Sequence, residues 1–223
     1  MQWSLVGSEM CIRDRWRETM KLYNSVGPNP HVVRMYAAEC GVALELEEVD
    51  LMGGANRQAD YLKLNPSGQL PCLETEGGDL IAEVTAICEY IDEKADGVTL
   101  IGTTDEARAN TRMWTRRVDL GICEPLANGF RYSEGLPIFK DRMTIIPDAA
   151  DGLKQIAREK TSWLNDQMID GRAFIGGDEI SLADVLLYCF LNFGKAIGQP
   201  YDTGLANIHK WFESMNARES ASA

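Results

Sequence analysis

The pattern of hydrophobic positions is richest in strand signals near the beginning of the chain. Between residues 20 and 51, a short apolar run, a helical period and an alternating stretch predict a strand, a helix and a second strand. Asn29 followed by Pro30 is typical of a helix N-cap and a first helical position, and Gly41 of a helix end. Such a β-α-β unit has parallel strands and a right-handed connection.

Shorter patterns continue this first part to residue 94. Residues 56–64 are a short helix candidate, and residues 83–94 show one apolar helical face. Two short apolar runs, 71–74 and 80–82, are separated by a Gly-Gly turn that indicates a hairpin. The predicted order is β-α-β-α-β-β-α, an α/β sandwich with one mixed sheet.

Strand patterns disappear after a Gly- and Thr-rich linker at residues 96–105. Helical periods cover residues 106–128 and 147–169, and residues 208–215 close the chain. Ser181 and Asp184 resemble a capping box before residues 185–193, which are apolar all round. We therefore predict that this last helix is the buried centre of an all-helical domain.

Residues 1–19 are excluded from the fold prediction, because they show no helical or strand period and no caps. Arginines follow their short apolar part where a signal peptide would be cleaved. The stretch SLVGSEMCIRDR resembles a translated sequencing adapter, so we expect Met20 to be the true start; a disordered natural extension is the alternative. The expected organisation is a non-native or disordered leader, a first domain, a linker and an all-helical domain, at residues 1–19, 20–95, 96–105 and 106–218.

Composition indicates an acidic globular protein. Apolar residues make up 45% of the chain, and 34 acidic against 22 basic residues give a formal net charge of -12. Such a surface repels nucleic acid and anionic membranes, so we expect neither as a partner. Six scattered cysteines without a C-x-x-C pair predict buried thiols in a reducing compartment, and two histidines argue against a histidine-based metal site.

The most informative segment is NPSGQLP at residues 65–71, between the second predicted helix and a strand. A proline that opens a strand after a Gly-x-x turn is a candidate for a cis peptide, with a trans proline as the alternative. A cis Leu70–Pro71 bond would turn the main-chain N–H and C=O of Leu70 outward at a sheet edge. An extended peptide could pair with them there, as an added strand does.

Glu83 opens the predicted helix after the hairpin. The first amides of a helix attract a carboxylate, and Glu83 offers a carboxylate to an amine, so together they could hold the head of an α-amino acid. The alternative is that Glu83 only complements the helix dipole, an interaction of about 0.3–1 kcal/mol.

The order of these motifs resembles the cytosolic glutathione transferase family over nearly all of residues 20–216. The resemblance rests on KLY before a loop and a helix, on NPSGQLP, on E-x-x-AI from Glu83, and on S-L-A-D after FIGGD. It is closest to bacterial members with a fungal-type atypical active site. The family implies a thioredoxin-like domain followed by an all-helical one, a cytoplasmic homodimer, and glutathione as co-substrate without a metal.

The resemblance assigns residues to glutathione. Leu70, beside a cis Pro71, is expected to pair with the cysteinyl backbone, and Gln69 to lie next to it. Glu83 is expected to meet the γ-glutamyl amine. Arg57 matches a position that contacts the glycyl carboxylate, which suits one of the few cations in this acidic domain.

Two positions near these residues depart from the family pattern or leave a choice. Most relatives have serine after the glutamate, but this chain has Val84, so only its N–H can serve, and Thr85 is the neighbouring hydroxyl. The family activates the thiol with a hydroxyl or cysteine after the first strand. Ser25 is our first candidate and Asn29 the second, since its amide could donate to a thiolate. A solvated serine and a simple N-cap are the alternatives.

We expect the second substrate to sit against the first long helix, with Trp114, Arg117, Asn128, Phe130, Arg131 and Tyr132 as candidates. Salt bridges in a dimer are the alternative role for the pair Arg116 and Arg117. Packing is the alternative role for most of the aromatic ones. The predicted function is attack of the glutathione thiolate on a hydrophobic electrophile. The alternatives are a non-catalytic binding module of the same fold and a glutathione-dependent peroxidase or reductase.

Overall fold

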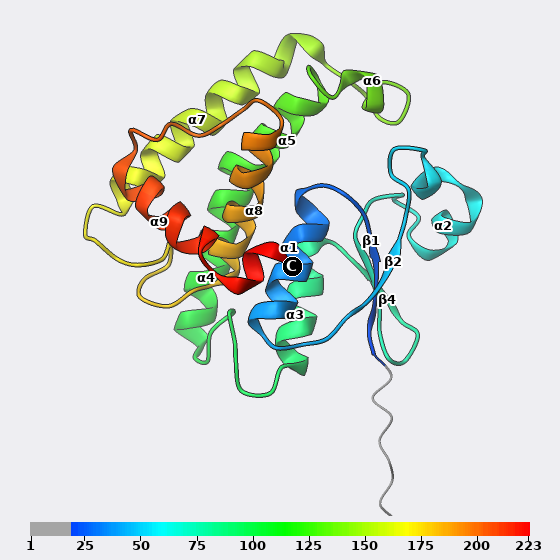
Figure 1. Cartoon of the computed structure of the whole chain (residues 1–223), viewed down its shortest axis with the longest axis horizontal. Coiled ribbons are helices and arrows are strands. Elements are labelled where there is room, and N and C mark those ends of the chain that lie inside the picture. Colours follow the sequence, from blue (N-terminus) through cyan, green and yellow to red (C-terminus); the bar gives the residue numbers. More distant parts are fainter. Residues whose placement is uncertain (1–18) are drawn as a thin grey trace, which may run out of the picture.

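Residues 19–223 are described by a computed structural model, and they begin with a β-α-β-α-β-β-α unit (Figure 1). Its elements are β1 (Lys21–Asn24), α1 (Pro28–Glu39), β2 (Glu45–Glu48), α2 (Ala59–Leu64), β3 (Cys72–Glu74), β4 (Leu80–Ala82) and α3 (Val84–Lys94). The predicted order is confirmed. Residues 1–18, most of the expected leader, lie outside the described residues.

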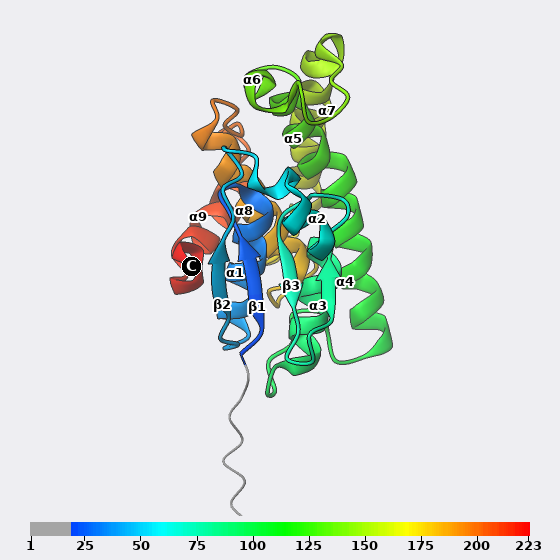
Figure 2. The same cartoon turned by 90° about the vertical axis from the view of Figure 1, so that its right-hand side faces the viewer.

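The four strands form one mixed sheet in the order β2-β1-β3-β4. Leu22 of β1 lies opposite Leu46 of the parallel strand β2 and opposite Leu73 of the antiparallel strand β3. In Figure 2 the sheet is seen face-on, with α2 in front of it and α1 and α3 behind it. Since β3 is an inner strand, Leu70 lies at the end of an inner strand, and its prediction at a sheet edge was wrong.

Helix α1 begins earlier than the sequence predicted. Its N-cap is Gly27, with φ 115°, and Pro28 and Pro30 lie in its first turn. Asn29 is therefore a residue of that first turn and not the N-cap. Prolines are tolerated here because the first N–H groups of a helix have no partner within the helix.

No strand follows α3 in the described part of the chain, as predicted; apart from one isolated bridge between Phe174 and Gly177, its regular elements are helical. They are α4 (Asp105–Val118), α5 (Glu124–Arg131), α6 (Leu136–Phe139), α7 (Ala150–Gln167), α8 (Leu182–Ala196) and α9 (Ala206–Asn216). Short 3-10 turns occupy Ala55–Arg57, Pro147–Ala149 and Glu219–Ser222. A π-helical turn, Asp119–Cys123, joins α4 to α5 where the sequence predicted one regular helix. Helix α8 is buried along most of its length, as predicted, and packs against α1.

The carboxylate of Asp184 is fully buried and joins three segments. It accepts hydrogen bonds from the N–H and hydroxyl of Ser181, at 2.9 and 2.7 Å, which complete the predicted capping box. It also accepts from the N–H of Ile175 at 2.8 Å and from Nε1 of Trp211 at 2.9 Å. One side chain thus fixes the start of α8, the loop before it and α9.

The C-terminal segment is bound to α1, beside which the chain ends in Figure 1. Arg218 donates two hydrogen bonds to the Glu39 carboxylate, at 2.5 and 2.7 Å, and the Ser220 hydroxyl donates a third. His31 Nε2 lies 3.1 Å from the Ala221 carbonyl oxygen. Burial alone would raise the pKa of Glu39, but the hydrogen bonds from Arg218 and Ser220 hold it below its ordinary value.

Replacement of Asp184 by alanine is expected to lower the free energy of unfolding by about 3–5 kcal/mol, because it leaves buried donors without an acceptor. Asp178→Ala removes an exposed carboxylate from the preceding segment and should change it by less than about 0.5 kcal/mol. Urea unfolding of both variants measures the difference. Equal effects would show that the Asp184 hydrogen bonds contribute nothing.

Glu39 is expected to make stability depend on pH. Its folded-state pKa lies below the ordinary value of 4.5, so its contribution is complete above about pH 4.5 and is lost as the pH falls through the folded-state pKa. The stability lost on Glu39→Gln should therefore shrink in acid. Glu219→Gln, at an exposed carboxylate nearby, serves as the control. A Glu39→Gln loss that stays constant from neutral to acid pH would contradict this account.

Candidate functional site

The loop 65–71 is held in place by side chains behind it. The carbonyl of Gln69 accepts hydrogen bonds from the Tyr61 hydroxyl, at 2.7 Å, and from Asn65 Nδ2, at 3.0 Å. The peptide bond before Pro71 is cis, the first of the two predicted alternatives. Two donors on one carbonyl thus fix the main chain immediately before Leu70.

The main chain of Leu70 is available to a ligand. The ladder between β1 and β3 ends at the pair Tyr23 and Cys72, so Leu70 lies beyond the paired residues. Among residues 19–223, its N–H and C=O have no hydrogen-bond partner. An unpaired donor and acceptor next to a strand end can accept the backbone of an extended peptide.

A charged cavity of about 250 Å³ lies beside Leu70. It brings together every residue that was predicted to bind glutathione or to activate its thiol, except Ser25: Asn29, Arg57, Gln69, Leu70, Pro71, Glu83 and Val84. Thr85, Asp119, Glu124 and Arg131 also line it. The cavity therefore offers separate positive and negative groups to a small zwitterionic ligand.

Two of the charged side chains have unused polar groups. Glu83 is the N-cap of α3 and has φ 71°, an uncommon conformation for a residue other than glycine, and its carboxylate makes no capping hydrogen bond. Arg57 donates from Nη1 to the Ser67 carbonyl at 3.2 Å, while its Nε is buried without a partner in the described part of the chain. The Glu83 carboxylate can engage a ligand without breaking a capping contact, and the Arg57 guanidinium can do so through its outer nitrogens at the cost of one long hydrogen bond, because its Nε is buried.

Asp119 is a site residue that the sequence did not reveal. It opens the π-helical turn between α4 and α5, and it lines the charged cavity. Burial, and then the nearby charge of Glu124, raise the pKa of Asp119. A regular helical period gives no sign of a π turn, and such turns are frequent at functional sites.

A second cavity, of about 370 Å³, adjoins the first and is mainly apolar. Its apolar lining includes Val26, Leu51, Met52, Ala127, Phe130, Ile138 and Phe193. The two cavities share Asn29, Gln69, Leu70, Arg131 and Phe139. A charged ligand and an apolar ligand can therefore meet at these shared residues.

The candidates for the second-substrate site fall into two groups. Phe130 and Arg131 line the apolar cavity. The others lie outside it: Trp114 is buried with its ring centroid 6.0 Å from that of Trp163, Arg117 lies over the Trp114 ring, and Asn128 donates to Glu124. Tyr132 lines neither cavity.

The two candidates for thiol activation are placed differently. Ser25 is only 4% exposed and lines neither cavity, whereas Asn29 lines both. Tyr23, a poor candidate from its place in the first strand, donates its hydroxyl to Glu74 at 2.8 Å and packs against Tyr61. Asn29 is thus the better placed residue at the start of α1.

Arg142 ties the segment after α6 to the loop at residues 51–52, which lines the apolar cavity. It follows α6, and its Nη1 and Nη2 donate to the carbonyls of Leu51, at 2.6 Å, and Met52, at 2.8 Å. Both of these residues line the apolar cavity. In Figure 1, α6 extends from the helical part toward the loops around α2. Arg142 therefore fixes one wall of this cavity to the other.

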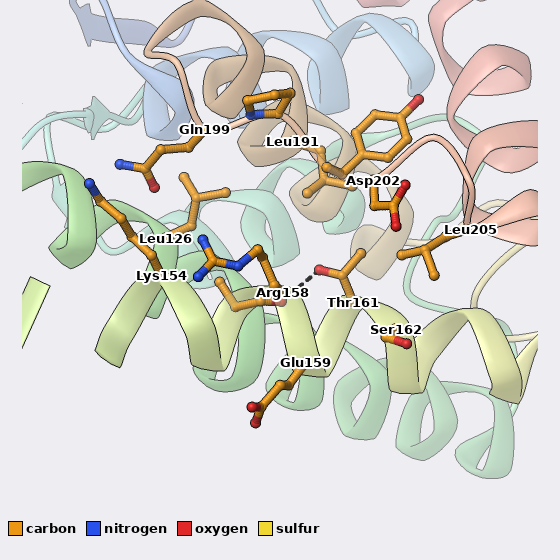
Figure 3. A pocket seen from close by; sticks show the side chains of 13 residues that line it. Leu126, Lys154, Arg158, Glu159, Thr161, Ser162, Leu191, Gln199, Asp202 and Leu205 are labelled. Atoms are coloured by element: carbon orange, nitrogen blue, oxygen red, sulfur yellow. Dashed lines mark hydrogen bonds between the residues drawn. The ribbon is translucent and has the colours of Figure 1, made fainter. Parts of the chain in front are cut away.

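A third cavity, of about 310 Å³, lies apart from these two, between α5, α7, α8 and residues 199–205 (Figure 3). It shares no lining residue with them. Several of its polar groups are used internally: Thr161 donates to the Ala157 carbonyl at 2.8 Å, and Lys154 donates to Glu134 at 2.7 Å. It is not part of the candidate site.

Two wider searches concern only residues 19–223. No group of three or more His, Cys, Asp or Glu side chains there could hold a metal ion. None of the helices in this range has the length and apolar character needed to cross a membrane.

Comparison with known proteins agrees with this architecture. Residues 26–94 match the glutathione S-transferase N-terminal domain, and residues 148–219 match the C-terminal domain. A glutathione S-transferase domain-containing protein of Marinobacter aquaeolei is 30% identical, with a TM-score of 0.84 over 90% of this chain and 99% of that chain. Gtt2 from Saccharomyces cerevisiae is 26% identical, with a TM-score of 0.83 over 91% and 98%.

The thioredoxin-like unit, the helical part and the paired cavities define a protein of the glutathione transferase class. The chain belongs to the glutathione S-transferase family. Elongation factor 1-gamma of Prunus avium is also similar, at 29% identity over 77% of this chain and 39% of that protein.

Arg142→Ala is expected to loosen the wall of the apolar cavity and to raise the KM for a hydrophobic electrophile about 5–20-fold, with the Kd for glutathione nearly unchanged. Two hydrogen bonds to main-chain carbonyls are lost, at about 0.5–1.5 kcal/mol each. Lys140→Ala, at an exposed residue of the same segment, is the control. Steady-state kinetics and calorimetry separate the two effects. Weakened glutathione binding with an unchanged electrophile KM would contradict this role.

Proposed function

We propose that this protein conjugates the thiolate of glutathione to hydrophobic electrophiles. The observation that carries the proposal is the pair of adjoining cavities, one charged and one apolar, that share Leu70. Membership of the glutathione S-transferase family supports it. The charged cavity takes the tripeptide, and the apolar cavity takes the electrophile.

The charged groups suit the two ends of glutathione. The cysteinyl backbone pairs with the N–H and C=O of Leu70. Glu83 receives the γ-glutamyl amine, while Arg57 receives the glycyl carboxylate; Asp119 lines the same cavity. The γ-glutamyl carboxylate faces the first N–H groups of α3, because Val84 offers no hydroxyl.

The reaction needs a thiolate at neutral pH. A free thiol has a pKa of about 8.5, and lowering it by about two units takes about 2.7 kcal/mol. The thiol proton goes to solvent, the sulfur anion forms a bond to the electrophilic carbon, and the leaving group departs with its bonding pair. Asn29, which lines both cavities, is our proposed donor to sulfur at the start of α1, and Ser25 stays a prediction for the same role.

Glu83→Gln and Arg57→Met are each expected to weaken glutathione binding about 10–100-fold, since each removes a charge-assisted hydrogen bond of about 1.5–3 kcal/mol. Lys63→Met, at an exposed cation on α2, is the control. Calorimetry with reduced glutathione measures all three. An unchanged Kd in both site variants would refute this mode of binding.

Turnover of an aryl halide tests the enzymatic proposal. Asn29→Ala is expected to lower kcat/KM about 10-fold, because one hydrogen bond to the thiolate is lost. Ser25→Ala is expected to change it less, since Ser25 lines neither cavity. A larger loss in Ser25→Ala would restore the first sequence-based choice. Wild-type protein that binds glutathione but turns over no electrophile in a broad panel would sink the proposal.

A non-catalytic binding module of the same fold is the second candidate function. The similarity to elongation factor 1-gamma favours it, because in that longer protein the region similar to this chain is only one part of the whole. It differs from the first proposal in predicting glutathione binding without turnover. The homodimer implied by the family resemblance also stays a prediction.

A further inference from the structure

The residues shared by the two cavities surround the place where the reacting atoms must meet. They are Asn29, Gln69, Leu70, Arg131 and Phe139. If the cysteinyl backbone lies along Leu70, its sulfur reaches these residues before it can reach the electrophile. A group that stabilises the sulfur anion is therefore best sought among them.

The usual sources of thiolate stabilisation are weak here. Within residues 19–223, Thr85 is the one hydroxyl-bearing residue that lines either cavity, and it lines the charged cavity alone. The first turn of α1 also offers few main-chain N–H groups to a thiolate, because Pro28 and Pro30 carry no N–H. Asn29 keeps the one main-chain N–H between them. The site therefore needs another donor or positive charge.

Arg131 is the one cation among the shared residues. Its Nη1 donates to Asn128 Oδ1 at 2.9 Å and lies 3.9 Å from Glu124 Oε2. Its guanidinium carbon lies 5.9 Å from the centroid of the Phe139 ring. Nε and Nη2 have no hydrogen-bond partner among the described residues. These contacts hold the guanidinium at the junction and leave N–H groups free to donate to a ligand.

We propose that Arg131 is a catalytic residue that stabilises the glutathione thiolate where the two cavities meet. The inference rests on the proposed function, because it requires bound glutathione. The thiol proton leaves to solvent, and the guanidinium donates to the remaining sulfur anion. The Glu124 side chain is 45% exposed, so water screens its opposing charge. The other charged groups, Arg57, Glu83 and Asp119, line the charged cavity alone.

The test compares the full chain with Arg131→Met and Arg131→Lys. Ultraviolet absorbance of the bound thiolate, followed against pH, gives the pKa of the glutathione thiol. Arg131→Met is expected to raise it by about 1–2 units, toward the free value of about 8.5. Arg131→Lys keeps the positive charge but lacks the planar donors, so it should raise the thiol pKa only about half as much as Arg131→Met does. Arg158→Met, at an exposed arginine in the third cavity, is the matched control.

The pH dependence of kcat/KM provides a second, independent test. At a pH of about 6.5, Arg131→Met is expected to lower kcat/KM about 10–100-fold, a loss that shrinks above the thiol pKa because both proteins then hold a thiolate. The Kd for glutathione at low pH, where the ligand is a neutral thiol, should change by less than about 3-fold. An unshifted thiol pKa in Arg131→Met, or a loss of equal size at every pH, overturns the inference.

Failure of the proposed function has a different signature. If wild-type protein binds glutathione and lowers its thiol pKa but turns over no electrophile, the transferase proposal falls, and the titration of Arg131→Met still decides the role of Arg131. If wild-type protein leaves the thiol pKa at its free value, the role of Arg131 is refuted.

Discussion

Helix α1 has to pack on both of its sides at once, and the candidate site depends on this. Its buried residues, including Val32, Val33 and Tyr36, face α3 on one side and α8 on the other. The Tyr36 hydroxyl donates to Asp92 at 2.6 Å, and Arg218 binds Glu39 near the C-terminal end of α1. Because the helix is fixed along its length, its first turn has a defined position; that turn lines the apolar cavity, and its Asn29 lines both cavities.

Sequence patterns predicted the fold well where local and tertiary preferences agree. The alternating stretch of β2, the Gly-Gly hairpin and the all-apolar helix α8 each carry a strong local pattern that agrees with the final fold, so the sequence identifies them, even though β2 is exposed on both of its faces. The start of α1 was predicted less well, because Asn29-Pro30 and Gly27-Pro28 both suit a helix start and only the packed structure chooses between them. The π turn that brings Asp119 into the site is equally hidden, since it adds one residue to a turn without changing the composition.

The same distinction applies to the site. Glu83 and the NPSGQLP segment carry recognisable chemistry within short stretches of sequence, so local patterns are enough to select them. Arg142 acts across a long sequence separation, on the carbonyls of Leu51 and Met52, and a local pattern has no access to such contacts. Asp119 reaches the cavity through the π turn, which leaves no sign in the helical period. The preference for Asn29 over Ser25 likewise comes from burial, because both types of side chain can donate to a thiolate and the structure places only Asn29 at the cavities.

Because the chain is strongly acidic, binding of an anionic ligand depends on where the cations of the protein lie. The chain carries a formal charge of -12, yet glutathione is itself an anion, so long-range attraction cannot bring it to the site. Binding then depends on short-range, partly buried contacts, for which a carboxylate or guanidinium counts far more than the distant surface charge. In the binding mode that we propose, Arg57 would provide one such contact at the carboxylate end of glutathione, and Arg131, held by Asn128, would provide another at its sulfur. An acidic protein of this family can thus select an anionic thiol by local geometry, while its surface continues to repel other polyanions.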